Sequence, residues 1–419
     1  MCFRDVAKLT DLPVEILQKI FSELIVWASQ TNAYLRPAQL MRSDCLRALA
    51  SLSQTSRFLH HAVEPFLNKH IKLCHRSGTR RAIALLRHWH RHPAAAASLR
   101  TLTTCGMKTI DDNDPKPLAG EDAAFLDGLL RRYGLQVPDR WLDTTACVSM
   151  LIGMVLLHAR NIRALDLNDD LKHFTALLPK NVVAAIRFDL LTSLRVRQFD
   201  PTPLENILPL LRLAPNLITV DLYQPEGGLG DGEVDWGNIH HLTLRGSLLP
   251  VDQLIRIIKA CRNLRLFHYE SNNVFVDQAV IRALLHHTST LSSLQLVLGG
   301  RHTIMHENAD IYPDAMALPS VSRFSELRSL CLSERYMGSD SRCVLSSLPS
   351  ALEKLTVDDD MDALREVGTA GFEALAGRFR NGEYPQLREV TLGTFFRAEE
   401  HHYIIRKILT DVGLLCHVK

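Results

Sequence analysis

Residues 239–245, Ile-His-His-Leu-Thr-Leu-Arg, place apolar side chains at their first, fourth and sixth positions. The same spacing recurs in nine other stretches, of which the first is the weakest because Thr104 occupies its sixth position. Side chains alternate between the two faces of a β-strand, so the fourth and sixth positions share one face. Each stretch therefore predicts a short strand with one buried face. The other nine stretches begin at Leu99, Ile162, Leu191, Leu217, Leu264, Leu291, Leu327, Leu352 and Leu387.

A helical pattern precedes these strands, as in residues 254–258, where apolar side chains recur at helical spacing. One strand–helix unit leaves its apolar face uncovered, whereas a stack of units shares one long core. The repeated pattern resembles that of leucine-rich repeats. The resemblance implies an α/β solenoid, with a curved parallel sheet and helices on its convex side. Separate βαβ domains are the rival architecture, but their strands are apolar on both faces, and the alternation here argues against them.

We expect the repeat domain to span residues 99–419, with irregular repeats and a closing helix at about 399–415. The number of repeats within residues 106–160 stays open, because no clear copy of the pattern falls there. Residues 74–98 are expected to form a helical connection into the repeats.

The amino-terminal region carries a second kind of pattern. Residues 12–21, Leu-Pro-Val-Glu-Ile-Leu-Gln-Lys-Ile-Phe, predict a helix start, with Pro13 in the first turn and Glu15 near the positive end of the helix dipole. Apolar side chains then follow on one side of the helix. A further helical pattern covers residues 49–71.

Taken together, residues 8–73 resemble an F-box, a small all-α module, with an insertion at residues 25–46. Two positions depart from the usual F-box pattern, where Thr55 and Phe58 stand in place of Cys and Trp. The resemblance implies that the module binds a Skp-type adaptor and, through it, a cullin. The residues that it assigns to the adaptor contact are Leu12, Pro13, Glu15, Ile16, Leu17, Ile20, Phe21, Leu52 and Phe58. The alternative is that this helix merely covers the first repeat.

The side chains at the third, fifth and seventh positions of each seven-residue stretch should point away from the core, onto the concave face of the sheet. Arg, Tyr and His are residue types that protein interfaces favour. In the middle repeats these positions hold Arg195, Arg197, Asp221, Tyr223, His241, Arg245, His268 and Glu270, which we take as candidate substrate-binding residues. The alternative is that they are solvated side chains without a partner.

Composition and residue spacing bear on which classes of function the chain can have. The chain of 419 residues is 46% hydrophobic and 22% charged, which is typical of an ordered protein. Its nine cysteines form no CxxC pair, its His pairs lack ligand spacing, and no catalytic motif stands out. We therefore expect no enzyme activity, no cofactor, no metal, no nucleic-acid partner, no membrane association, and a cytoplasmic or nuclear location.

The two resemblances together imply the substrate-recognition subunit of an SCF-type ubiquitin ligase. In that function the F-box holds the adaptor and the leucine-rich repeats hold a protein substrate. The alternative is a leucine-rich-repeat scaffold that binds proteins without a role in ubiquitin ligation.

Overall fold

A computed structural model describes residues 12–30, 47–74, 78–105, 118, 120–135, 145–168, 187–197, 201–229, 234–271, 278–298, 321–333, 344–345, 348–358, 369–393 and 399–418. The chain divides into two compact units, residues 1–191 and 192–419. Each unit is described by itself.

The first unit opens with a small helical module. It consists of α1 (Val14–Gln30), a helical stretch at residues 47–53, and α3 (Arg57–Leu67). Ser56 caps α3, because its side-chain oxygen accepts a hydrogen bond from the backbone N–H of Leu59 at 3.2 Å. The module has a core of its own, made of Leu17, Phe21, Leu49, Leu59, Ala62, Val63 and Phe66.

Three parallel strands and four helices are described in the remainder of the first unit. The strands are β1 (His70–Cys74), β2 (Thr101–Cys105) and β3 (Ala164–Leu167), in that order across the sheet. The helices are α4 (Gly78–Arg91), α5 (Pro93–Ala97), α6 (Gly120–Arg132) and α7 (Thr145–His158). Residues 70–73, which the sequence placed in the helical module, therefore belong to the sheet.

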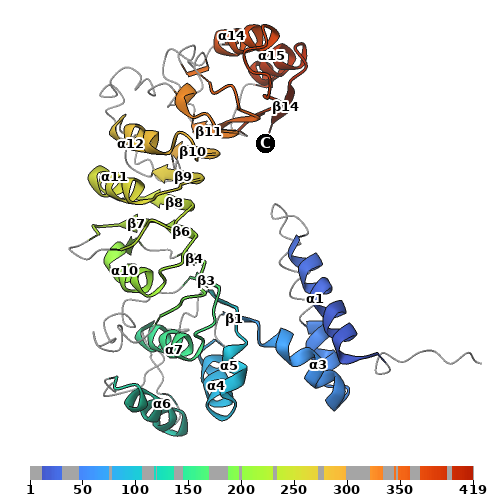
Figure 1. Ribbon diagram of the computed structural model, residues 1–419, viewed down its shortest axis with the longest axis vertical. Helices are drawn as coiled ribbons and strands as arrows, with labels where there is room; N and C mark the ends of the chain where they lie inside the picture. Colours follow the sequence, from blue (N-terminus) through green and yellow to red (C-terminus); the bar gives the residue numbers. More distant parts are fainter. Residues whose placement is uncertain are drawn as a thin grey trace, which may run out of the picture. The chain divides into compact units, whose positions relative to one another are not determined.

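The second unit is a long open sheet with helices (Figure 1). Its strands lie side by side in chain order, and every pair among them is parallel. They are β4 (Ser193–Val196), β6 (Thr219–Tyr223), β8 (His241–Ser247), β9 (Leu266–Ser271), β10 (Ser293–Leu298), β11 (Ser329–Ser333), β12 (Lys354–Asp358), β13 (Glu389–Leu392) and β14 (Leu415–Val418).

Helical segments connect these strands. They are α10 (Leu204–Leu213), α11 (Val251–Ala260), α12 (Gln278–Leu284) with the 3-10 turn η3 (Leu285–His287), η6 (Val321–Arg323), α14 (Thr369–Arg380) and α15 (Glu399–Thr410). Figure 1 shows α10, α11 and α12 on the same side of the strands. We call the opposite face of this sheet the open face.

The apolar pattern of the sequence corresponds to the core. All three pattern positions in all ten stretches are buried, and none is more than 4% exposed. Thr104, the one polar member, is fully buried, and its hydroxyl oxygen accepts a hydrogen bond from the backbone N–H of Asn168 at 3.1 Å. The α/β class and the long parallel sheet are confirmed. In the part of residues 106–160 that the structure describes, α6 and α7 are present and no strand is assigned.

The end of the chain differs from the expectation of one closing helix at 399–415. α15 ends at Thr410, and residues 415–418 form the strand β14 beside β13. Gly413 has a φ of 88°, a conformation that glycine adopts without strain, and it lies in the turn between the two elements. The strand was missed because Leu415-Cys416-His417-Val418 lacks the preceding apolar position of the other stretches.

A tight corner follows β6 and β8 at their carboxyl ends. Gln224 has a φ of 49° and Gly246 a φ of 57°. The backbone N–H of Gln224 donates to the carbonyl oxygen of Arg245 at 2.6 Å, and its own carbonyl accepts from Thr202 at 2.8 Å. The chain continues from Gln224 into β7 (Pro225–Glu226), which pairs in parallel with β5 (Thr202–Pro203). A register shift in β8 lies between Leu244 and Ser247.

The alternation of buried and open positions gives a direct test within one strand. Leu242 is fully buried, so Leu242→Ala should lower the stability of the protein by about 2–5 kcal/mol. Its neighbour Thr243 lies on the open face, and Thr243→Ala should change stability by no more than about 0.5 kcal/mol. Urea unfolding followed by circular dichroism measures both, and equal losses would contradict the assignment of the two faces.

Candidate protein-interaction sites

The amino-terminal module leaves large apolar side chains exposed. Ile16 is 46% exposed, Ile20 is 40% exposed, and Pro13 is exposed as well. Positions 13, 16 and 20 fall on one side of α1, because residues three and four apart are neighbours on a helix surface. We call Pro13, Ile16 and Ile20 the apolar stripe. Phe58, at the start of α3, is also 40% exposed.

The remaining adaptor candidates divide into two groups. Leu17 and Phe21 lie inside the module core, where the rings of Phe21 and Phe66 meet edge to face with centroids 6.0 Å apart. These two side chains hold the module together and are not presented to a partner. Leu12 and Leu52 are half-buried against the same core, and Glu15 is exposed. The sequence pattern did not separate the stripe from the core, because both recur at helical spacing.

The candidate residues of the second unit lie on its open face. The parallel registers align equivalent positions of successive strands, so that Arg195 lies beside Asp221, and Tyr223 beside Arg245. Thr243 likewise lies beside His268. The structure therefore brings together residues that are 20 to 30 positions apart in the sequence, as the repeat predicted.

Asp221 connects three strands. Its side chain is only 7% exposed. Arg195 Nε donates to Asp221 Oδ2 at 2.8 Å, and Arg245 Nε lies 3.7 Å from Asp221 Oδ1. The two arginine side chains remain 43% and 42% exposed. A nearly buried carboxylate thus draws two guanidinium groups toward one point while their outer parts stay open to solvent.

The neighbours of this cluster have shifted pKa values. Burial lowers the pKa of His268 to about 4; the charge of Arg245 lowers it further, and Asp221 opposes the shift. His268 is therefore neutral at pH 7, and its Nε2 atom is buried without a hydrogen-bond partner. Burial raises the pKa of Glu270, with Arg245 opposing the shift and Asp358 adding to it.

The other candidates on this face lie nearer the solvent. Tyr223 is 36% exposed, and Arg197, directly after β4, is exposed. His241 is half-buried beside Thr219, whose hydroxyl lies 3.4 Å from His241 Nδ1. Burial lowers the pKa of His241, and the charges of His240 and Arg265 lower it further.

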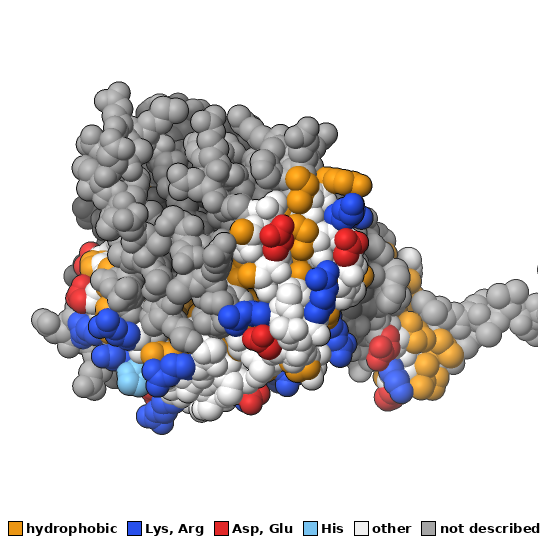
Figure 2. Space-filling view, turned by 90° about the horizontal axis from the view of Figure 1, so that it is seen from above, with side chains coloured by type: hydrophobic (Ala, Val, Ile, Leu, Met, Phe, Trp, Pro, Cys, Tyr) orange, Lys and Arg blue, Asp and Glu red, His pale blue; other side chains and the backbone are white. Residues whose placement is uncertain are grey.

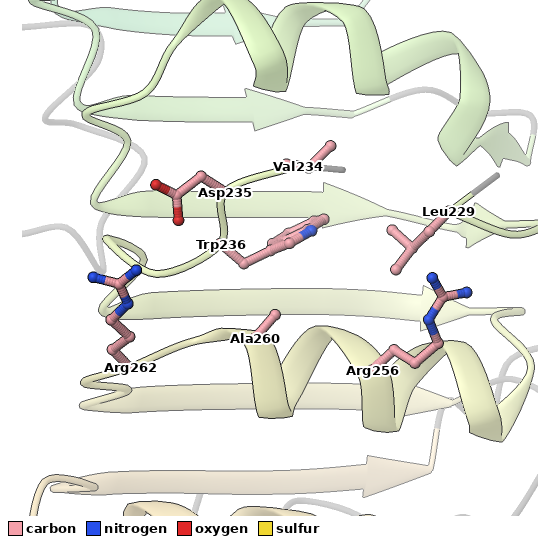
Figure 3. A pocket seen from close by; sticks show the side chains of 7 residues that line it. All are labelled: Leu229, Val234, Asp235, Trp236, Arg256, Ala260 and Arg262. Carbon is pink, nitrogen blue, oxygen red and sulfur yellow. The ribbon is translucent and has the colours of Figure 1, made fainter. Parts of the chain in front are cut away.

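A cavity of about 610 Å³ is lined by side chains of α11, by Arg262 after it, and by Leu229 and residues 234–236 (Figure 3). Figure 3 shows Trp236 at its middle, Arg256 beside Leu229 at one end, and Arg262 beside Asp235 at the other. Asp235 Oδ1 accepts a hydrogen bond from the backbone N–H of Gly237 at 2.9 Å. Among the described side chains that line it, no nucleophile is paired with a base.

The carboxyl-terminal end of the second unit also exposes apolar side chains. Tyr403 and Ile404 on α15 are 69% and 44% exposed, and Leu415 and Val418 on β14 are 62% and 43% exposed. Figure 2 looks down on this end of the chain and shows hydrophobic side chains among charged ones.

Within the part of the chain that the structure describes, no cluster of His, Cys, Asp or Glu is arranged to hold a metal ion. None of the described helices is both long and apolar enough to cross a membrane. No protein-family model matches this chain, and no curated protein matches it significantly.

The pairing at Asp221 predicts a structural role for that side chain. Asp221→Ala leaves the two arginines without the carboxylate between them, and it should cost about 1–2 kcal/mol, a value reduced because the guanidinium groups are partly exposed. Asp221→Asn, whose side-chain oxygen can still accept the hydrogen bond from Arg195, should lose less stability than Asp221→Ala. Urea unfolding ranks the variants, and an Asp221→Ala protein as stable as the wild type would contradict the pairing.

The neutral state of His268 predicts a pH dependence. The pKa of this imidazole is about 4 in the folded chain against 6.5 ordinarily, so the unfolded chain binds more protons between these values. Stability should therefore fall as the pH is lowered from about 6.5 to about 4. His268→Gln should reduce this fall. Thermal melts of both proteins across this range measure it, and parallel curves would show that His268 is not the group responsible.

Proposed function

We propose that this chain is the substrate-recognition subunit of an SCF-type ubiquitin ligase. In this proposal residues 8–73 act as an F-box that binds a Skp-type adaptor and, through it, a cullin. The second unit acts as part of a leucine-rich-repeat solenoid that holds a protein substrate on its open face.

The apolar stripe is the observation that carries the proposal. The module buries Leu17, Phe21 and five further residues in a core of its own, so it does not need the stripe for its stability. Pro13, Ile16 and Ile20 nevertheless remain exposed on one side of α1. Burying one such side chain fully contributes about 1.5–3 kcal/mol, which makes a row of them suitable for contact with a partner.

The open sheet supports the second half of the proposal. Side chains of the types that interfaces favour, Arg, Tyr and His, occupy neighbouring strands there. A chain with this function does no chemistry itself. Its contribution is to raise the local concentration of a substrate near the transfer enzyme.

A leucine-rich-repeat scaffold without a ligase role is the second candidate. It is favoured by the departures of the module from the F-box pattern at Thr55 and Phe58. Co-purification with the adaptor and a cullin distinguishes the two functions.

Substitutions in the stripe test the adaptor contact. Ile16→Glu with Ile20→Glu should abolish capture of the chain by a purified Skp-type adaptor, because it places two charges in an apolar contact. Leu12→Ala with Pro13→Ala should also abolish capture, since the two residues begin the same contact. Neither change should alter the far-UV circular dichroism spectrum.

Ile218→Glu is the matched control, because Ile218 is an isoleucine of similar exposure, 39%, that belongs to the second unit and not to the module. It should leave capture unchanged. Undiminished capture by the stripe variants would remove the F-box assignment, while equal loss in all three proteins would point to a general defect.

A further inference from the structure

The charges of the open face are separated along the sheet. The first three strands of the second unit, together with Arg197 directly after β4, carry three arginines against one aspartate. The next five strands, β9 to β13, carry Lys354 against Glu270, Asp358 and Glu389. One end of the described face is therefore net positive and the other net negative.

The positive end keeps its charge accessible. Asp221, the one acidic side chain there, is 7% exposed and lies beneath the two guanidinium groups that it attracts. Arg195 and Arg245 remain more than 40% exposed, and Arg197 is exposed. The charge that an approaching molecule meets on these strands is therefore mainly that of arginine.

The negative end begins on the adjacent strand. Glu270 lies opposite the register shift in β8, next to Arg245, and burial raises the pKa of its carboxyl group. Asp358 lies in the same row of equivalent strand positions. In that row Glu270 pairs with Val297 of β10, and Ser333 of β11 pairs with Asp358 of β12. A basic group placed over this row would stabilise both carboxylates.

We infer that the open face binds an extended segment of a protein partner whose charges are separated, with acidic residues over β4, β6 and β8 and basic residues over β9 to β12. Charge complementarity of this kind fixes the register and rejects partners of the wrong order. The inference rests on the part of the proposed function that places a protein substrate on this face.

The length of the segment follows from the strand spacing. From β4 to β12 there are six steps between neighbouring strands. At about 4.8 Å a step, they span about 29 Å, which an extended chain of about nine residues covers.

Two peptides of identical composition test the inference. One has three Glu, a Gly-Ser-Gly spacer and three Lys, and the other has the same residues with Glu and Lys alternating. Fluorescence anisotropy with the full chain should give a Kd about tenfold lower for the segregated peptide. Because the peptides have the same net charge, non-specific attraction affects both. Equal affinities would overturn the inference.

Three variants locate the contact. Arg245→Gln and Glu270→Gln should each weaken binding of the segregated peptide about fivefold, since each removes one charge that faces the peptide. Arg212→Gln, which removes an exposed arginine in the last turn of α10, should leave the Kd unchanged. If Arg245→Gln fails to fold because it also disturbs Asp221, Glu270→Gln gives the answer alone. An unchanged Kd in Glu270→Gln would contradict the assigned site.

This experiment needs neither adaptor nor cullin. If the wild-type chain binds the segregated peptide more tightly but is not captured by the adaptor, the ligase function is overturned and the charged site remains. If the wild-type chain is captured by the adaptor but binds both peptides equally, the charged site is overturned and the ligase function remains.

Discussion

The structure of the second unit depends on the shared burial of apolar side chains between neighbouring strand–helix units. No unit covers its own apolar face, so each strand depends on its neighbours for stability. The fully buried Leu194, Leu242 and Phe267 are members of one such series. Because burial uses only alternate side chains, the sheet is left with a second face whose residues are free to serve another purpose.

Ion pairs between side chains of neighbouring strands lie on that face. Arg195 and Asp221 occupy equivalent positions of adjacent strands, and so do Lys354 and Glu389, whose Nζ and Oε1 atoms are 2.6 Å apart. The lateral pairs hold side chains in place before any partner arrives, which reduces the entropy lost on binding. They also complicate mutagenesis, since charge reversal at Arg195 or Arg245 disturbs Asp221 as well as any contact with a partner.

Most of the sheet could be predicted from the sequence, because buried pattern positions and apolar residue types coincide in all ten stretches except at Thr104. β1 and β14 could not, since neither carries the full pattern, and their place depends on pairing with β2 and β13. In the module, the resemblance to an F-box assigned Leu17, Phe21, Ile16 and Ile20 to one contact, and their helical spacing did not divide them further. Only the packing against α3 separates the core pair from the exposed pair. The pairing of Arg195 with Asp221 follows from the repeat register, but the near-complete burial of Asp221 does not.

The proposed function requires that the module at the amino terminus, and not the sheet, binds the adaptor. Hydrogen–deuterium exchange of the full chain, with and without a purified Skp-type adaptor, tests it most directly. If the module binds the adaptor, backbone amides in residues 12–30 and 47–67 should gain protection, and those in residues 192–418 should gain none. Protection confined to the strands of the second unit, or no change anywhere, would contradict it.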